Sequence, residues 1–515
     1  MVKIFNMRQF FFSILGISFL FVSCNDRDDN IQTYTSSASV EDFIWKGLNF
    51  WYFWQAEVED LDDNRFASSQ EYSNFITSFA SPDMLFYNLC NQHTAIYDDA
   101  NTIDRFSYIT DDYTSLVNSL SGSYTTNGVE FGLAQFSDSN DIYGFVKYIM
   151  TNSNASTKNI HRGDIFTGVN GIQLTLDNYN DLLYGNTSYT LNMASIVNAS
   201  LVTDFHPQRA AISENGVTVD LTKESYTENP VFKVATFSNA GHTIGYLMYN
   251  GFTADFNTEL NNAFAQLKGA NVTDLVIDFR YNGGGSVNTS RILSSLITGQ
   301  FTGDLYIKQR WNDKIQSQLS DAELSDYFTN TNSDGASLNS LQLSEVYVLT
   351  TYQTASASEL VINALDPYIT VHQIGASTRG KNEFSITLVD DPGNSYIYSD
   401  NRINYINTNN SWGMQPLVGR NANAAGFYDY ADTGFIPDTQ MAEDLTNMGI
   451  LGNETEPFLA EAIAQITGSA RKAYQPIKIS LKEFANSKSY IKPFNNMYVE
   501  KTPDIHISDI SFPND

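Results

Sequence analysis

The chain has 515 residues and a formal net charge of −29 at pH 7, from 29 Lys and Arg against 58 Asp and Glu. This acidic balance argues against nucleic-acid binding, which needs clustered basic side chains to meet the phosphates. With 42% hydrophobic residues, including 34 Phe and 30 Tyr, the chain is not a disordered one, and its length predicts two or three domains.

Residues 1–23 have the pattern of a signal peptide, with basic residues before an apolar run at 10–22. The small residue followed by Cys24 is similar to a bacterial lipobox, and the NDRDDN segment after it resembles the surface-export signal of Bacteroidetes lipoproteins. We therefore expect a lipidated Cys24, a tether over 24–38, and an outer-membrane lipoprotein that touches the membrane through this anchor only. An ordinary secretory signal and an uncleaved anchor are the alternatives.

A helical domain is expected over residues 39–122. Apolar residues recur at helical spacing in VEDFIWKGLNFWYFW, at 40–54, and again in the two segments that follow. The many aromatic residues favour packing in a core, with an aromatic cage for a ligand as the alternative. Cys90 lies here, and with Cys24 lipidated it leaves no intramolecular disulfide and no cysteine-based metal site.

Residues 123–205 change to the alternation of β-strands, most clearly at 128–136. With the turn at 161–164 they resemble a PDZ domain, in which Phe131-Gly132-Leu133 stands in place of the carboxylate-binding loop. PDZ domains bind peptide C-termini by strand addition. The alternative is a small β module without a ligand.

A βαβ unit follows the connector that begins at residue 206. A strand at 245–252 and a helical run at 255–267 precede the strand 273–280, which ends in a glycine turn. Such glycines allow close backbone approach, so that the N–H of Gly284, or of its alternative Gly285, can point at an oxyanion. The glycines equally suit a simple tight turn.

Two hydroxyls, Ser356 and Ser358, lie between a β-branched run at 346–349 and an apolar helical run at 360–365. A strand-to-helix turn exposes free backbone N–H groups and favours negative charge. A nucleophilic serine needs a base, and none of the six histidines has a recognisable catalytic setting. Lys381, 25 residues past Ser356, fits that role if burial lowers its pKa.

An ordinary structural interpretation competes with this one. Ser356-Ala-Ser-Glu359 also matches the S-x-x-E capping box that begins many helices. A lysine after a glycine turn is commonly just solvated. The local pattern leaves both interpretations open.

Three segments closely resemble the carboxyl-terminal processing, or tail-specific, proteases. TASASEL (354–360) and GASTRGK (375–381) match the nucleophile and lysine segments of the family, and 273–285 matches its DLRNNPGG motif with Gly283 in place of proline. The resemblance implies a dyad in which Ser356 is the nucleophile and Lys381 the general base. The oxyanion hole would consist of the N–H groups of Ala357 and Gly284.

The implied fold is a multidomain α+β or α/β one. It has the helical domain, the PDZ-like module, a catalytic core of the tail-specific protease (crotonase-like ββα) type over 206–470, and a tail, 471–515, without an assigned role. The implied protein is a cell-envelope serine endopeptidase that acts on proteins or peptides, recognises their C-termini, and needs no metal or cofactor. A catalytically inactive, peptide-binding surface lipoprotein with the same fold is the main alternative. A Ser-His-Asp hydrolase and a zinc hydrolase are disfavoured because G-x-S-x-G and H-E-x-x-H are absent.

The chain departs from the family pattern after the lysine. Many members place a glutamine four residues further on, where this chain has Ser385. Ser385 or Glu383 can orient the amine, although a charge pair of Glu383 with Lys381 would raise the lysine pKa and oppose base catalysis. The third catalytic residue stays open.

Overall fold

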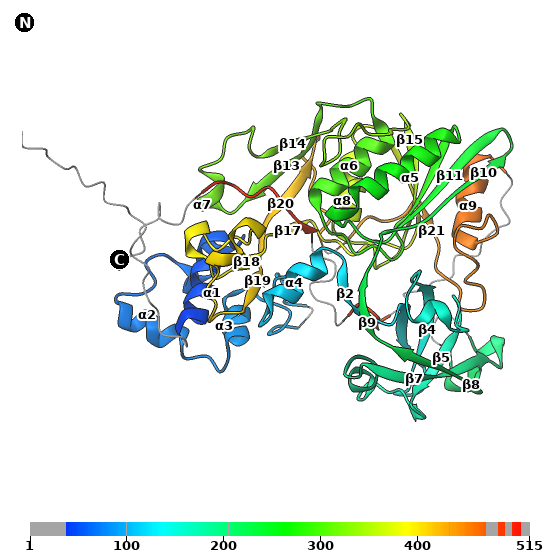
Figure 1. Ribbon diagram of the computed structural model, residues 1–515, viewed down its shortest axis with the longest axis horizontal. Coiled ribbons are helices and arrows are strands. Elements are labelled where there is room, and N and C mark those ends of the chain that lie inside the picture. The colour runs from blue at the N-terminus through cyan, green and yellow to red at the C-terminus, as the bar shows by residue number, and fades with distance from the viewer. Residues whose placement is uncertain are drawn as a thin grey trace, which may run out of the picture.

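The computed structural model describes residues 38–98, 100–202, 207–431, 433–469, 483–489 and 497–505. The predicted signal peptide and Cys24 lie outside these ranges. Figure 1 shows a helical region at the left end, a sheet with helices on the right, and a smaller β module below that sheet. No helix in the described ranges combines the length and the apolar character needed to cross a membrane.

The N-terminal region is helical, as predicted, and the aromatic residues at 43–54 lie in the hydrophobic core or pack against it. Trp51 and Tyr52 are fully buried, and Trp51 packs against Trp311 of the central region with ring centroids 6.1 Å apart. Asn312 Nδ2 donates to the Phe50 carbonyl at 2.8 Å. One hydrophobic core therefore runs from these helices into the centre. The helices are α1 (Ala38–Trp51), α2 (Ser69–Ile76), α3 (Pro82–Leu89) and α4 (Tyr113–Leu120).

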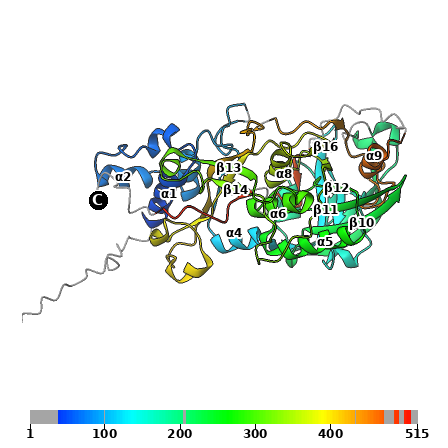
Figure 2. The ribbon, with the colours of Figure 1, turned by 90° about the horizontal axis from the view of Figure 1, so that it is seen from above.

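A six-stranded sheet with helices on both faces lies in the half of the molecule away from the N-terminal helices (Figure 2). Its strands in spatial order are β10 (Val231–Asn239), β11 (His242–Tyr249), β12 (Asp274–Asp278), β15 (Glu345–Thr350), β16 (Thr370–Gly375) and β21 (Thr439–Gln440). One face packs against α5 (Asn257–Gly269), α6 (Val287–Thr298) and α8 (Ala357–Leu365), and the other against α9 (Pro457–Ile466). All strands from β11 onward are parallel, so the segments after β12 and β15 leave the sheet at the same edge.

The small β module has its own hydrophobic core. Its strands are β3 (Val129–Gln135), β4 (Ile142–Ile149), β5 (Ile165–Val169), β6 (Ile172–Gln173), β7 (Ser188–Ile196) and β8 (Ile212–Thr222), with a short π-helix, η4 (Asn180–Tyr184), before β7. Strand β8 pairs with β7 along most of its length. The sheet thus extends past residue 205, where the sequence predicted the module to end.

Smaller sheets connect these parts. The first contains β14 (Ser325–Tyr327), β13 (Leu305–Trp311), β20 (Leu417–Asn423), β17 (Glu383–Ser385) and β23 (Met497–Tyr498), with α7 (Asp313–Gln316) next to β13. The second contains β1 (Tyr108–Thr110), β19 (Gly413–Gln415) and β18 (Leu388–Val389), and the third β2 (Ser123–Thr126) and β9 (Glu224–Thr227). The tail supplies β23 and also β22 (Ala485–Asn486), which joins the sheet of the β module.

Candidate active site

Ser356 lies at the junction of β15 and α8, in a backbone conformation that side chains rarely adopt. Its φ is 65° and its ψ −118°, a sparsely populated region that costs on the order of 1–3 kcal/mol and is held by the surrounding structure. The residue is fully buried, and its hydroxyl has no hydrogen-bond partner within the described ranges. A strained serine with an unbonded Oγ is more than an ordinary helix cap.

Glu359 holds this turn together. The first turn of α8 has the arrangement of a capping box, with Glu359 three residues after Ser356. In it, the Ser356 N–H donates to Glu359 Oε2 at 2.7 Å. The same Oε2 accepts the N–H of Lys381 at 2.9 Å, and Oε1 accepts the Gly380 N–H and the Thr378 hydroxyl at 2.6 and 2.5 Å. Burial raises the pKa of Glu359, and these four bonds oppose that rise.

Lys381 is fully buried. Its pKa is lowered from 10.5 to about 7. Desolvation is the main cause, the charge of Glu383 opposes it, and the positive charge of Arg379 adds to it. The Nζ atom lies 4.6 Å from the centroid of the Phe106 ring. A lysine in this environment is partly neutral near pH 7 and can accept a proton. Ser356 Oγ and Lys381 Nζ are not hydrogen-bonded to each other, which is common before a substrate is bound.

The N-terminal region supplies part of the lysine environment, which sequence analysis missed. Besides the Phe106 ring, Arg105 donates from Nη2 to the Gly380 carbonyl at 2.5 Å. Asp104 Oδ1 accepts the Phe106 N–H at 3.0 Å and fixes this loop. The aromatic residues of this region gave no local signal that would single out Phe106.

The two residues predicted to orient the amine take different positions. The Ser385 hydroxyl bonds Gln415 Oε1 at 2.6 Å and the Met497 carbonyl at 3.1 Å, so it does not orient Lys381. Glu383 pairs with Arg420 at 3.3 Å. Burial raises the pKa of Glu383, and the charges of Arg420 and Lys381 oppose that rise. Glu383 therefore influences Lys381 through its charge, which raises the pKa of the lysine.

The glycine turn after β12 lies directly against the serine. A Cβ on Gly284, whose φ is 110°, would come within 2.5 Å of Ser356 Cβ and 2.8 Å of its Oγ. The Gly284 N–H donates to Asn282 Oδ1 at 2.9 Å, so it must exchange this bond to serve as an oxyanion donor. The alternative donor, Gly285, uses its carbonyl to accept the Tyr498 N–H at 3.2 Å. Ala357 is buried at the start of α8.

Asn282 joins the glycine turn to the serine segment. Its carbonyl accepts the Ala355 N–H at 3.1 Å and the Ser358 hydroxyl at 3.1 Å. The second serine of the motif therefore has a structural partner, whereas the hydroxyl of Ser356 has none among the residues that the structure describes. This difference supports Ser356 as the reactive serine.

A buried charge network lies behind the glycine turn. Arg280 is fully buried, with Nη2 at 2.6 Å from Asp278 Oδ2 and Nη1 at 2.7 Å from Glu456 Oε1. Arg162 of the β module enters the same network, 2.7 Å from Glu443 and 2.6 Å from the Tyr281 hydroxyl. The turn at 161–164, predicted from sequence as a turn of the PDZ-like module, therefore also contacts the part of the chain that carries Tyr281 and Glu443.

Phe131-Gly132-Leu133 do not form a loop. They lie inside β3 and pair with Val146, Phe145 and Gly144 of β4. The strand predicted at 128–136 is therefore confirmed. The comparison of 131–133 with a carboxylate-binding loop does not hold for the backbone, because this segment is hydrogen-bonded along β4 with a register shift only between Glu130 and Phe131. The outer side of the same three residues carries the tail strand β22.

The histidines of the described ranges have other partners. His242 Nδ1 lies 2.8 Å from Asp274, and His372 Nε2 lies 3.1 Å from Glu345. His93 is buried against the Tyr87 ring, with ring centroids 4.5 Å apart. None of them is hydrogen-bonded to Ser356, whose hydroxyl has no partner there.

Two parts of the chain match family models. Residues 243–408 match Peptidase family S41, and residues 39–108 match the Peptidase S41 N-terminal domain. Among curated proteins none matches the chain.

Solved structures of similar shape include a candidate S41 protease from Bacteroides fragilis. It is 23% identical, with 83% of this chain and 98% of that chain covered and a TM-score of 0.58. The photosystem II D1 C-terminal processing protease is 18% identical, with 86% and 100% covered and a TM-score of 0.46. Mature CPAF complexed with lactacystin is 12% identical, with 84% and 98% covered and a TM-score of 0.42. The first of these shows that the chain has the same overall fold.

Proposed function

We propose that the chain is a serine endopeptidase using a dyad of Ser356 and Lys381. The proposal is supported by the matches of residues 243–408 to Peptidase family S41 and of residues 39–108 to the Peptidase S41 N-terminal domain. One observation carries the proposal. A strained serine with an unbonded hydroxyl and a buried lysine of lowered pKa are tied, through their backbones, to a single carboxylate.

The chemistry follows from these two side chains. Neutral Lys381 takes the proton of the Ser356 hydroxyl while Oγ attacks the scissile carbonyl carbon. The amine then returns the proton to the leaving nitrogen, and a water hydrolyses the acyl-enzyme by the same proton transfers in reverse order. The N–H of Ala357, with that of Gly284 or Gly285, stabilises the oxyanion by about 3 kcal/mol per donor.

Recognition of substrate C-termini is proposed for the β module. Its support is the outer edge of β3, which accepts an added strand in the manner of PDZ domains. The ends of substrate chains would dock there and extend toward the serine. A binding assay with peptides that differ only in a free or amidated C-terminus tests this preference.

We also propose that the protein is an outer-membrane lipoprotein of the cell envelope. The support is the signal-peptide pattern that ends at Cys24. Incorporation of an alkyne-labelled fatty acid that disappears in Cys24→Ser is the expected result. Incorporation that persists in this variant would overturn the proposal.

Labelling with a fluorophosphonate tests the catalytic assignment. Wild-type protein should be labelled and should cleave a peptide library, while Ser356→Ala should do neither. Ser358→Ala is the matched control, since Ser358 bonds the Asn282 carbonyl, and it should keep the label. Lys381→Ala should lose cleavage; an unchanged rate would reject Lys381 as the base. Absence of both labelling and cleavage in the wild type would favour the inactive peptide-binding alternative.

A further inference from the structure

The tail occupies the free edge of the β module. Phe484 N donates to the Leu133 carbonyl at 3.2 Å, and Ser487 N donates to the Phe131 carbonyl at 3.1 Å. The Phe131 N–H in turn donates to Ser487 Oγ at 3.2 Å. Residues 483–489, named here the tail segment, therefore add an antiparallel strand to β3.

On its other side the tail segment contacts η4, through Tyr179, which precedes this helix, and Tyr184, its last residue. The Phe484 ring packs edge-on against the Tyr179 ring, with centroids 5.3 Å apart. The Tyr184 hydroxyl donates to the Asn486 carbonyl at 2.8 Å. The tail segment thus lies between a strand edge and a helix, which is where a peptide added as a strand gains both main-chain bonds and side-chain contacts.

Opposite charges lie at the two ends of the tail segment. Glu483 accepts from Lys147 Nζ at 2.7 Å and is also bonded by the Gln353 amide, from the loop that precedes Ser356. At the other end, Lys488 Nζ lies 2.6 Å from Glu228. The site therefore matches a segment with an acidic residue first, then an aromatic one, then small polar residues and a basic one.

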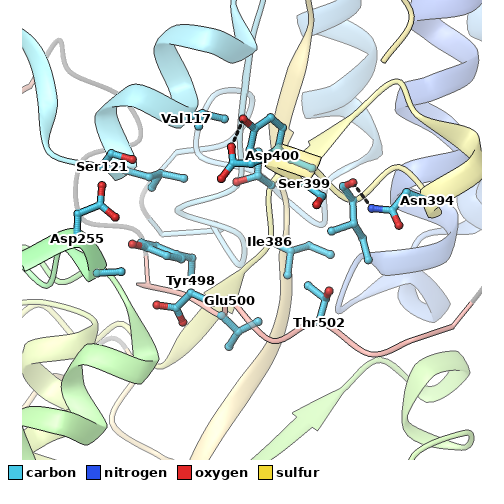
Figure 3. A pocket seen from close by; sticks show the side chains of 16 residues that line it. Val117, Ser121, Asp255, Ile386, Asn394, Ser399, Asp400, Tyr498, Glu500 and Thr502 are labelled. Atoms are coloured by element: carbon cyan, nitrogen blue, oxygen red, sulfur yellow. Dashed lines mark hydrogen bonds between the residues drawn. The ribbon is translucent and has the colours of Figure 1, made fainter. Parts of the chain in front are cut away.

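The tail continues into the catalytic core. Strand β23 pairs in parallel with β17, and the Tyr498 N–H donates to the Gly285 carbonyl at 3.2 Å. Glu500 bonds the hydroxyl of Ser286, which caps α6. Beside β23 is a cavity of about 510 Å³ between α4, the strand region at 386–400 and the tail, lined by Asp255, Tyr498 and Glu500 among others (Figure 3). The tail thus contacts both the outer edge of β3 and the glycine turn.

We propose that the tail segment is a built-in ligand of the β module, which a substrate segment of the same chemical character must displace before it can bind at β3. The inference rests on the proposed function in that the displacing ligand is a peptide substrate. The site thus has a stated ligand class: an extended peptide with the order acidic, aromatic, small or amide, hydroxyl, basic.

A tethered ligand competes effectively because it is always near its site, at an effective concentration that can reach the millimolar range. The apparent affinity for an outside peptide falls by the fraction of time that the site is open. If the tail segment is docked about 99% of the time, the apparent Kd rises about 100-fold. Weak peptides are excluded, and substrates that also bind the catalytic core are favoured.

Peptide binding to protein in the Ser356→Ala background tests the proposal without cleavage. The probe is the fluorescent peptide LKEFANSKSY, which repeats the tail sequence. Ser487→Pro removes the N–H and the hydroxyl that bond Phe131, and Phe484→Asp removes the ring on Tyr179. Each should tighten binding of the probe at least tenfold. The control, Ser489→Ala, removes a hydroxyl that bonds only Asn486 within the tail and should leave the affinity unchanged.

Hydrogen exchange on the Ser356→Ala protein, with its tail otherwise unaltered, gives a second measurement that needs no tail variant. Saturating probe should accelerate exchange of the Phe484 and Ser487 amides, since the probe takes over their acceptors on β3. Equal probe affinity in all variants, or amides that stay protected at saturation, would overturn the inference. Probe binding as expected in a wild type that labels with no fluorophosphonate would reject the protease assignment and leave the tail proposal intact.

Discussion

Ser356 and Lys381 donate their backbone N–H groups to the same atom, Glu359 Oε2, at 2.7 and 2.9 Å. The two residues are 25 positions apart in the chain and lie on different segments, so this shared acceptor fixes the distance between nucleophile and base at the backbone. Glu359 is fully buried, and a carboxylate that accepts N–H groups in a dry site forms strong bonds. It is a positioning residue that touches neither substrate nor proton.

Replacing Glu359 with glutamine should separate the two catalytic segments. The amide nitrogen cannot accept, so at least one N–H of the site is left unbonded, at a cost of about 1–3 kcal/mol. We expect kcat to fall about 10- to 100-fold, with little change in KM. Peptidase kinetics and circular dichroism check this. Glu345→Gln, on the half-exposed partner of His372, is the control and should keep full activity; equal rates in both variants would contradict the role of Glu359.

Ser356 was predicted as the nucleophile from its motif, whereas the features that single it out in the structure were not readable from sequence. The pattern Ser356-Ala-Ser-Glu359 predicts a capping box, and Glu359 does bond the Ser356 N–H. What distinguishes the serine is its positive φ and unbonded hydroxyl, and both depend on Asn282 and Gly284, which are more than 70 residues away in the chain. The local sequence pattern around Ser356 holds no information about contacts with residues so far away in the chain.

Activity should follow the titration of Lys381. Burial holds its pKa at about 7, so the free-base form needed for catalysis grows as the pH rises through this value. We expect kcat/KM to increase with pH along a single limb near 7 and then to level off. A flat profile between pH 6 and 8 would contradict the assignment. Because the folded pKa is depressed from 10.5 to about 7, burial of the charged amine destabilises the fold fully below pH 7. This destabilisation shrinks as the pH rises from 7 to 10.5 and is absent above 10.5.

Removing the Phe106 ring beside Lys381 should shift the pH dependence of kcat/KM. The Phe106 ring lies 4.6 Å from Nζ and excludes water from it. Phe106→Ala admits water, so desolvation weakens and the lysine pKa rises toward its ordinary value. The rise of kcat/KM should therefore occur at higher pH, so that activity is lower at pH 7 and recovers in alkaline buffer. Phe79→Ala, a partly buried phenylalanine elsewhere in the N-terminal region, should leave the limb in place.

The contact that Arg162 of the β module makes with Tyr281 and Glu443 also could not be predicted from the sequence. Arg162, Tyr281 and Glu443 come from three distant segments, and only the folded chain brings them within hydrogen-bonding distance. The buried charge of Arg280 offered a hint, since a charged residue that ends a buried strand needs partners. Sequence could not identify those partners.

Removal of the Arg162 guanidinium should uncouple the module from the glycine turn. Glu443 loses its 2.7 Å partner while it is still buried, but it keeps Arg280 Nη1 at 3.4 Å. The cost should therefore lie below about 3–5 kcal/mol, the cost of a buried charge left without any partner. We expect Arg162→Ala to lower the melting temperature and reduce peptidase activity. Binding of peptides to the module itself should remain. Arg209→Ala, on a partly exposed pair with Asp141, should change each of these far less.

The contact of Gly284 with the serine gives the sharpest structural test. A methyl group at this position would lie 2.5 Å from Ser356 Cβ and 2.8 Å from its Oγ, in a backbone with a φ of 110°. Gly303 has a similar φ, 90°, but nothing within 4 Å of an added Cβ. Both alanine variants therefore bear backbone strain of about 1–3 kcal/mol, and only Gly284→Ala also displaces the nucleophile. Fluorophosphonate labelling should be lost in Gly284→Ala and kept in Gly303→Ala at matched thermal stability. Equal labelling of the two would show that the glycine turn does not constrain Ser356, and the proposed oxyanion donors at Gly284 and Gly285 would then be withdrawn.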